Sequence, residues 1–115
     1  MTRTPLSELL PQFTKEVRTA LSAAGEVKLA DQVGGLIVYK CNYDPSCDAG
    51  YIRVQAANTL NVIDQNIIGT RHVRTVPIQH PCDIYVDVDN FDRITGIELL
   101  AASKYAEQLT SYNND

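Results

Sequence analysis

Five side chains in the middle of the chain are of the types that bind zinc or serve as nucleophiles. They are Cys41, Cys47, His72, His80 and Cys82. A structural zinc site needs four thiolate or imidazole ligands in a tetrahedron, and its cysteines usually come as C-x-x-C pairs, a spacing that is missing here. Four of these residues are candidate metal ligands: Cys41, Cys47, His80 and Cys82. The simpler interpretation is that Cys41 and Cys82 are small buried hydrophobic residues.

A cysteine beside a histidine could also act as a nucleophile. That chemistry needs a thiol with a lowered pKa and a third group that orients the histidine. His80 and Cys82 would share one face of a strand, but Pro81 lies between them and makes the backbone there uncertain. A small metal-dependent or Cys/His hydrolase is the alternative function that these residues leave open.

Acidic residues gather around the last predicted hairpin. They are Asp83, Asp87, Asp89, Asp92 and Glu98. Paired carboxylates can carry acid–base chemistry when a shared site separates their pKa values. A calcium loop does not fit, because Phe91 occupies a ligand position. Alternation along the strand is enough to explain where these acidic residues lie. We therefore favour a solvated strand face over an acid–base site, and such a face also hinders aggregation at a sheet edge.

Tyrosine, arginine and aspartate side chains are the candidates for binding a protein. Tyr51 and Arg53 alternate with apolar residues in one predicted strand, and Tyr85 and Asp87 do so in another. Exposed tyrosine and arginine are enriched at the energetic centres of interfaces, whereas aromatic pairs across strands also occur for structural reasons. We predict Tyr51, Arg53, Tyr85 and Asp87 as partner-binding residues, with Tyr39 as a further candidate for the same face, and no catalytic residue or cofactor.

The elements that must position these side chains begin with a helix predicted over residues 1–25. Its apolar residues follow i, i+3, i+4, i+7 spacing and form one stripe: Leu6, Leu9, Leu10, Phe13, Val17, Leu21 and Ala24. Thr4 is the expected N-cap, Pro5 the first helical residue and Gly25 the stop. Pro11 removes a backbone donor, so it should kink the helix or mark its true start.

An antiparallel sheet is predicted over residues 26–100. Apolar alternation predicts strands at residues 27–29, 36–41, 49–56, 83–89 and 93–99, with turns at 43–46 and 89–92. One or two further strands are expected between residues 57 and 81, where Leu60 and Val62 alternate with polar residues, around a loop at 66–71. Residues 101–111 have high helix propensity. We therefore expect one α+β domain: an antiparallel β-meander sheet with an N-terminal helix and a short C-terminal helix.

Composition narrows the classes of partner. The chain has 115 residues and a net charge of −4, and its arginines are spread out, which argues against nucleic-acid binding. No apolar run approaches the roughly 18 residues of a membrane span, and the start of the chain lacks a signal-peptide pattern, so we expect no membrane partner. Three cysteines, an odd number, fit reduced thiols and a cytoplasmic location.

Two stretches of the chain resemble a known family. The residues that carry the resemblance are Tyr43-Asp44-Pro45, Asp48-Ala49, Tyr51-Ile52, Val88-Asp89, Arg93-Ile94, Gly96-Ile97-Glu98-Leu99-Leu100 and Ala102-Ser103-Lys104. Over residues 39–104 the chain thereby resembles the uncharacterised prokaryotic family called domain of unknown function family 2283. The resemblance implies a small antiparallel β protein without an assigned activity. Since such genes often lie beside small toxin-like genes, it also implies an antitoxin or inhibitor role.

Two residues depart from the family pattern. Gly50 stands where an apolar residue is usual, and Asp92 replaces the usual turn glycine. Aspartate tolerates positive φ better than most residues, so the hairpin should form. The function predicted from the sequence is a non-enzymatic protein-interaction module. It would present either an exposed sheet face or the N-terminal helix to a protein partner or to a second copy in a homodimer.

Overall fold

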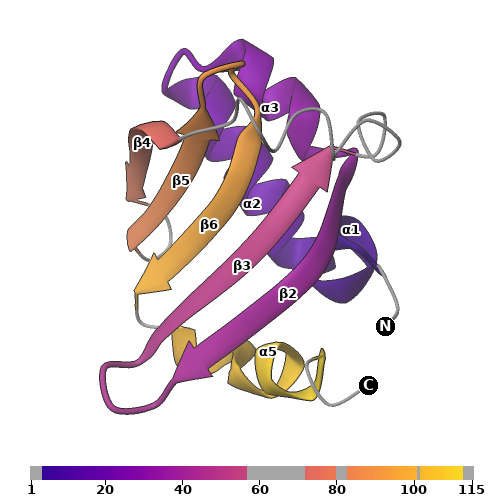
Figure 1. Cartoon of the computed structure of the whole chain (residues 1–115), viewed down its shortest axis with the longest axis vertical. Coiled ribbons are helices and arrows are strands. Elements are labelled where there is room, and N and C mark those ends of the chain that lie inside the picture. Colours follow the sequence, from indigo (N-terminus) through magenta and orange to yellow (C-terminus); the bar gives the residue numbers. More distant parts are fainter. Residues whose placement is uncertain (1–3, 57–71, 80–82, 101, 113–115) are drawn as a thin grey trace.

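The computed structural model describes residues 4–56, 72–79, 83–100 and 102–112. In this part of the chain, helices lie against one face of an antiparallel sheet (Figure 1), which confirms the α+β fold class. The elements in chain order are β1 (Thr4–Pro5), α1 (Leu6–Leu9), α2 (Pro11–Ala23), α3 (Val27–Val33), β2 (Leu36–Asp44), β3 (Ala49–Ala56), β4 (His72–Gln79), β5 (Asp83–Asp89), β6 (Ile94–Leu100), η2 (Ala102–Tyr105) and α5 (Ala106–Tyr112).

The sheet is built from a hairpin and a meander. Its strand order is β1-β2-β3-β6-β5-β4, so the β2–β3 hairpin joins the β4–β5–β6 meander where β3 pairs with β6. That central pairing sets Tyr51 opposite Glu98 and Arg53 opposite Gly96. Residues far apart in the sequence thus become neighbours in the middle of the sheet.

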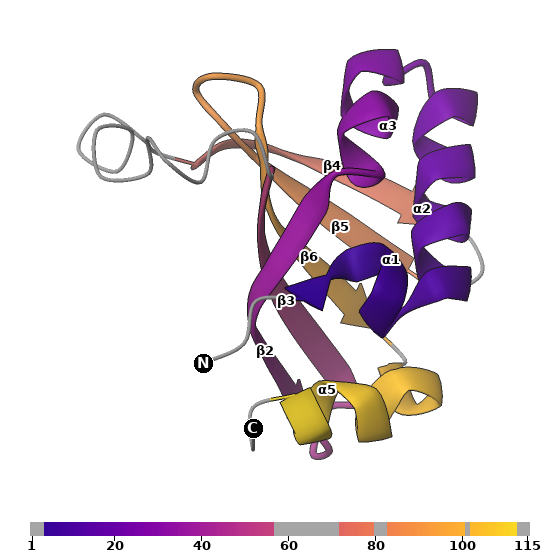
Figure 2. The ribbon, with the colours of Figure 1, turned by 90° about the vertical axis from the view of Figure 1, so that its right-hand side faces the viewer.

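The hydrophobic core lies between the sheet and helices α1 to α3, which Figure 2 shows stacked on one side of the strands. Alternation turns every second strand residue toward the helices, and α2 contributes one apolar stripe. The fully buried side chains of this layer include Phe13, Val17, Leu21, Val38, Ile52, Ile84, Val86, Ile97 and Leu99. Each such side chain stabilises the fold by about 1.5–3 kcal/mol relative to an exposed one. The apolar stripe expected in residues 1–25 is therefore core from Leu6 to Leu21, with Leu9 partly buried, whereas Ala24 is exposed.

The N-terminal segment is broken where a single helix was expected. Thr4 and Pro5 pair with Val38 and Ile37 as the edge strand β1, so Thr4 is not an N-cap. α1 ends at Leu9, and Pro11 begins α2 at a position where a missing N–H has no helical partner to lose. The expectation that Pro11 marks the true start of the helix is confirmed, and the uninterrupted helix over residues 1–25 is wrong.

The strand expected at residues 27–29 is also wrong. Residues Val27–Val33 form helix α3, which buries Leu29, Ala30 and Val33 against the sheet. The i, i+1, i+4 spacing of these three residues is helical. The strand prediction rested on Val27 and Leu29 alone, and two residues are too few to separate a strand from a helix. The sheet therefore starts its long strands at Leu36 rather than at residue 26. Leu60 and Val62 lie outside the described residues.

The C-terminal segment packs against the end of the β2–β3 hairpin. The expected helix over residues 101–111 is a 3₁₀ turn, η2, followed by α5. A Cβ at Gly50 would lie 2.7 Å from a Leu109 methyl carbon, so any other residue here would force the Leu109 side chain of α5 to move. The Tyr112 hydroxyl donates a hydrogen bond of 2.6 Å to the Val38 carbonyl. The departure of Gly50 from the family pattern thus has a structural reason, the docking of this helix.

Candidate protein-binding face

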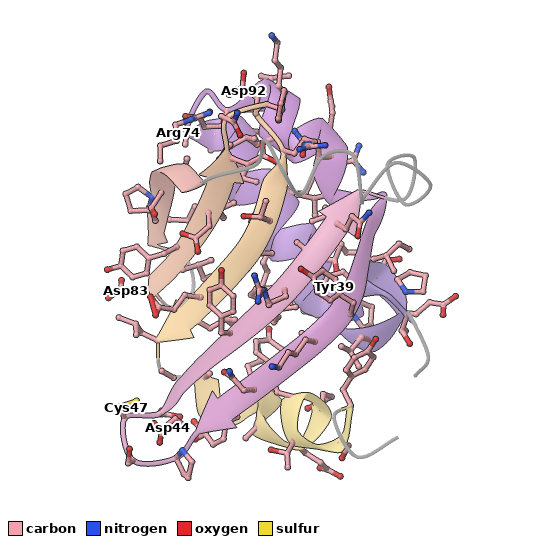
Figure 3. All side chains as sticks on the ribbon, in the orientation of Figure 1. Tyr39, Asp44, Cys47, Arg74, Asp83 and Asp92 are labelled. Atoms are coloured by element: carbon pink, nitrogen blue, oxygen red, sulfur yellow. The ribbon has the colours of Figure 1, made fainter. Side chains whose placement is uncertain are left out.

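The face of the sheet opposite the helices carries the predicted partner-binding residues, and no helix among the described residues covers it (Figure 2). Strand register places them in two adjacent rows. Tyr51 on β3, Glu98 on β6 and Tyr85 on β5 form one row. Arg53, Gly96 and Asp87 form the next. We call this surface the open face; Figure 3 looks directly onto it, with the labelled residues Tyr39 and Asp83 on its two sides.

Tyr51 lies flat across its neighbour strand. Its ring covers Gly96, where a Cβ would overlap the ring atoms, and its hydroxyl donates a hydrogen bond of 2.7 Å to Asp87 Oδ2. The Thr75 hydroxyl donates to the other carboxylate oxygen at 2.9 Å. These hydrogen bonds connect β3, β4 and β5 on the outer surface of the sheet. The Tyr51 ring leaves no room for a side chain at position 96 of β6.

The environment of Tyr51 keeps its phenol protonated. Burial raises the pKa of Tyr51, and the hydrogen bond to Asp87 and the negative charge of that carboxylate raise it further. Ionisation would put a second negative charge beside Asp87 and break the hydrogen bond. At neutral pH the phenol is therefore a fixed hydrogen-bond donor and has the wrong pKa for a general base.

Arg53 and the remaining tyrosines form the more accessible part of the open face. The Arg53 guanidinium lies 6.0 Å from the centre of the Tyr39 ring, at the outer limit of a cation–π contact. Arg53 is exposed, whereas Tyr39 and Tyr85 are half-buried. These side chains offer aromatic surface and a cation to an incoming molecule.

The structure thus brings Tyr51, Arg53, Tyr85 and Asp87 together on one surface, as the alternation predicted. The sequence analysis missed Thr75, whose role depends on the register of β4 against β5. It also missed the role of Gly96, although a glycine between apolar strand residues is a recognised signal of a close approach by another group.

The candidate metal ligands are not gathered in the described part of the chain. Cys41 is buried in the core, where burial raises the pKa of its thiol to about 11, and Cys47 is exposed in the turn between β2 and β3. His80 and Cys82 lie outside the described residues. Among the residues described, no three His, Cys, Asp or Glu side chains lie close enough to hold a metal ion.

The acidic group at the last hairpin is partly structural. Asp89 was expected on the solvated face, but it is buried, and its carboxylate accepts hydrogen bonds from Phe91 N, Arg93 N and Arg93 Nε at 2.8–3.0 Å. It shapes the turn in which Asp92 takes the expected positive φ of 58°. The Gln32 side chain of α3 anchors the same turn by donating to the Asp92 carbonyl and accepting from Ile94 N.

Comparison with known proteins identifies a family. The sequence model of the family described as "Protein of unknown function (DUF2283)" matches residues 40–103, which is more than half of the chain. The chain therefore belongs to this family. No curated protein and no solved structure matches the chain. In the described residues no helix has both the length and the apolar character needed to cross a bilayer.

Proposed function

We propose that this member of the family is a non-enzymatic protein-interaction module, which binds a protein through the open face. The observation that carries the proposal is the composition of that surface. Tyr39, Tyr51, Arg53 and Tyr85 gather on neighbouring strands, on the side of the sheet that no described helix covers. Tyrosine and arginine are the residue types that most often dominate binding energy at protein interfaces.

The network around Tyr51 supports this proposal. A ring held flat on Gly96 and bonded to Asp87 has already lost its rotational freedom before a partner arrives. Ordering a free side chain at an interface costs about 0.5–1.5 kcal/mol, so a preordered tyrosine binds at a lower entropic cost.

The two presentation modes expected from the sequence differ in their support. The apolar stripe of α2, with Phe13, Val17 and Leu21, is buried against the sheet and has no surface left for a partner. The open face retains its side chains at the surface. We therefore place the partner on the sheet. The partner is a protein of the cytoplasm in this proposal, either a toxin-like protein that the module inhibits or a second copy of the chain.

The experiment is affinity capture from cells with a tagged chain and two paired variants. Arg53→Ala with Tyr85→Ala truncates the open face and leaves the Tyr51 network in place. Arg18→Ala with Thr19→Ala likewise removes one arginine and one hydroxyl-bearing side chain, from exposed positions of α2. We expect the first pair to lose a bound protein that the wild type and the second pair retain, at unchanged thermal stability. Identical captured proteins for both pairs would contradict the proposal.

A further inference from the structure

The charged side chains of the open face are segregated by strand. Among the described residues, the cations are Lys40 on β2 and Arg53 on β3, which are direct cross-strand partners. The anions are on the other half of the sheet: Asp83 and Asp87 on β5, and Glu98 on β6. Because the strand order is β2-β3-β6-β5, a line between β3 and β6 divides a positive half from a negative half.

Asp44 is the exception to this division. It lies at the far end of β2, in the hairpin turn at the bottom of Figure 3. Its carboxylate accepts hydrogen bonds from the Ser46 hydroxyl at 2.6 Å and the Ser46 amide at 2.9 Å. These bonds lower the pKa of Asp44, so the side chain stays ionised. Strand register puts it in one row with Asp83, apart from the row that holds Lys40 and Arg53.

We propose that the occupant of the open face is a second copy of this chain, packed sheet to sheet. The two-fold axis runs along the strands, between β3 and β6. Rotation about it sets β2 of one copy over β5 of the other and β3 over β6, so that Lys40 and Arg53 meet the half that carries Asp87 and Glu98. Only the end row of the sheet, with Asp44 and Asp83, brings like charges together among the described residues. An axis across the strands would set β2 over β2 and β5 over β5, and like charges would repel. The inference rests on the proposed function, because it names the partner of that same surface.

The aromatic side chains fit the same arrangement. Tyr85 on β5 is brought over the strand that carries Tyr39, and Tyr51 lies next to the axis. In a two-fold interface a group away from the axis meets a different group of the other copy, and Tyr85 meets β2 in this way. Aligned sheets pack about 10 Å apart with their strands rotated by about 30°, a spacing that side chains of this size fill.

The size of the face predicts a reversible dimer. Five strands about 4.8 Å apart and about 23 Å long present roughly 500 Å² per copy. The pair buries on the order of 1,000 Å², which is near the lower limit for a specific interface. Interfaces of this size are typical of transient association, so dilution should separate the copies.

The experiment uses sedimentation velocity over a concentration series of the full chain and two charge-reversed variants. One carries Lys40→Glu with Arg53→Glu, and the other Glu98→Lys. Asp87 is left alone because it holds Tyr51, and Asp83 because it shares a row with Asp44. We expect a dimer for the wild type and at least about tenfold weaker self-association for each variant, since like charges then face each other. An equimolar mixture of the two variants should recover a dimer, because each reversed half meets its complement.

Matched controls reverse charges away from the open face. Lys15→Glu with Lys28→Glu, and Glu107→Lys, give the same changes in net charge on exposed helix residues. Dimers that persist in the face variants, or controls that behave like them, overturn the inference. A wild type that stays monomeric while Arg53→Ala with Tyr85→Ala still loses a captured protein overturns the second copy as partner and leaves the proposed function standing. A monomer whose face variants lose nothing overturns both.

Discussion

The two faces of the sheet are built from the same strands, yet they follow different rules. The covered face is apolar from edge to edge, with fully buried residues such as Ile52, Ile84 and Ile97. The open face carries tyrosines and charges, and its one tight contact, between Tyr51 and Gly96, joins the surface of the sheet rather than the core. Core packing explains the residues of the covered face. It does not explain most of the tyrosines and charges on the open face, and we attribute these to binding a partner.

The largest effect is expected on the covered face. Phe13 of α2 is fully buried and meets the Tyr105 ring edge-on at 5.3 Å. Phe13→Ala should lower the free energy of unfolding by about 3–5 kcal/mol, because it leaves a cavity. Chemical denaturation measures this loss. A loss below 1 kcal/mol would show that α2 is not packed as described.

High pH should also act through the covered face. Cys41 is buried against it with a thiol pKa raised from 9.0 to about 11. The stability from the buried neutral thiol is complete below about pH 9, where the unfolded thiol starts to ionise, and is lost as the pH rises to about 11. We expect the wild type to lose about 2 kcal/mol more than Cys41→Val over this interval. Parallel pH profiles for the two proteins would contradict the burial of this thiol.

The contact on the open face should give an intermediate effect with a distinctive coupling. Gly96→Ala places a methyl group where the Tyr51 ring lies and displaces the hydroxyl from Asp87. We expect a loss of about 1–2 kcal/mol, close to the value of a hydrogen bond to a charged group. In a Tyr51→Ala background the same change should cost almost nothing, since the ring is gone. A double-mutant cycle measures the difference, and additive effects would rule out the contact.

The smallest effect on stability is expected at the exposed Arg53 and the half-buried Tyr85 of the open face. Arg53→Ala and Tyr85→Ala should each change the free energy of unfolding by about 0.5 kcal/mol or less, as surface substitutions do. Their effect should fall on binding instead. A large loss of stability at both positions would mean that these side chains serve the fold and would remove the contrast between the two faces.

How far the sequence predicts this molecule differs between its two halves. In β3 and β5, strict alternation predicted both the strands and the face on which Tyr51, Arg53, Tyr85 and Asp87 lie. In α3 the apolar pattern was too short to separate helix from strand, and tertiary packing decided in favour of a helix. The position of Asp89 could not be predicted either, because a tight turn rotates the last residue of β5 toward Arg93 and out of the alternation.

The pairing of β3 with β6 was likewise beyond local reasoning. Strand order depends on contacts between residues distant in the sequence, and neither strand carries a signal for its neighbour. Gly50 carries a local trace of the docking of α5, and Gly96 carries one of the pairing of β3 with β6. Each is a glycine where a side chain would be expected, and each marks the approach of a distant group, Leu109 in one case and Tyr51 in the other.

Site-specific photo-crosslinking tests most directly whether the open face is the binding surface. A photoreactive amino acid replaces Tyr85 on the open face or Val27, which is 58 % exposed on α3 at the opposite side. Irradiation in cells should give a protein adduct from position 85, either to another protein or to a second copy of the chain, and none of comparable yield from position 27. Adducts from position 27 alone, or equal yields from both positions, would contradict a binding role for the open face.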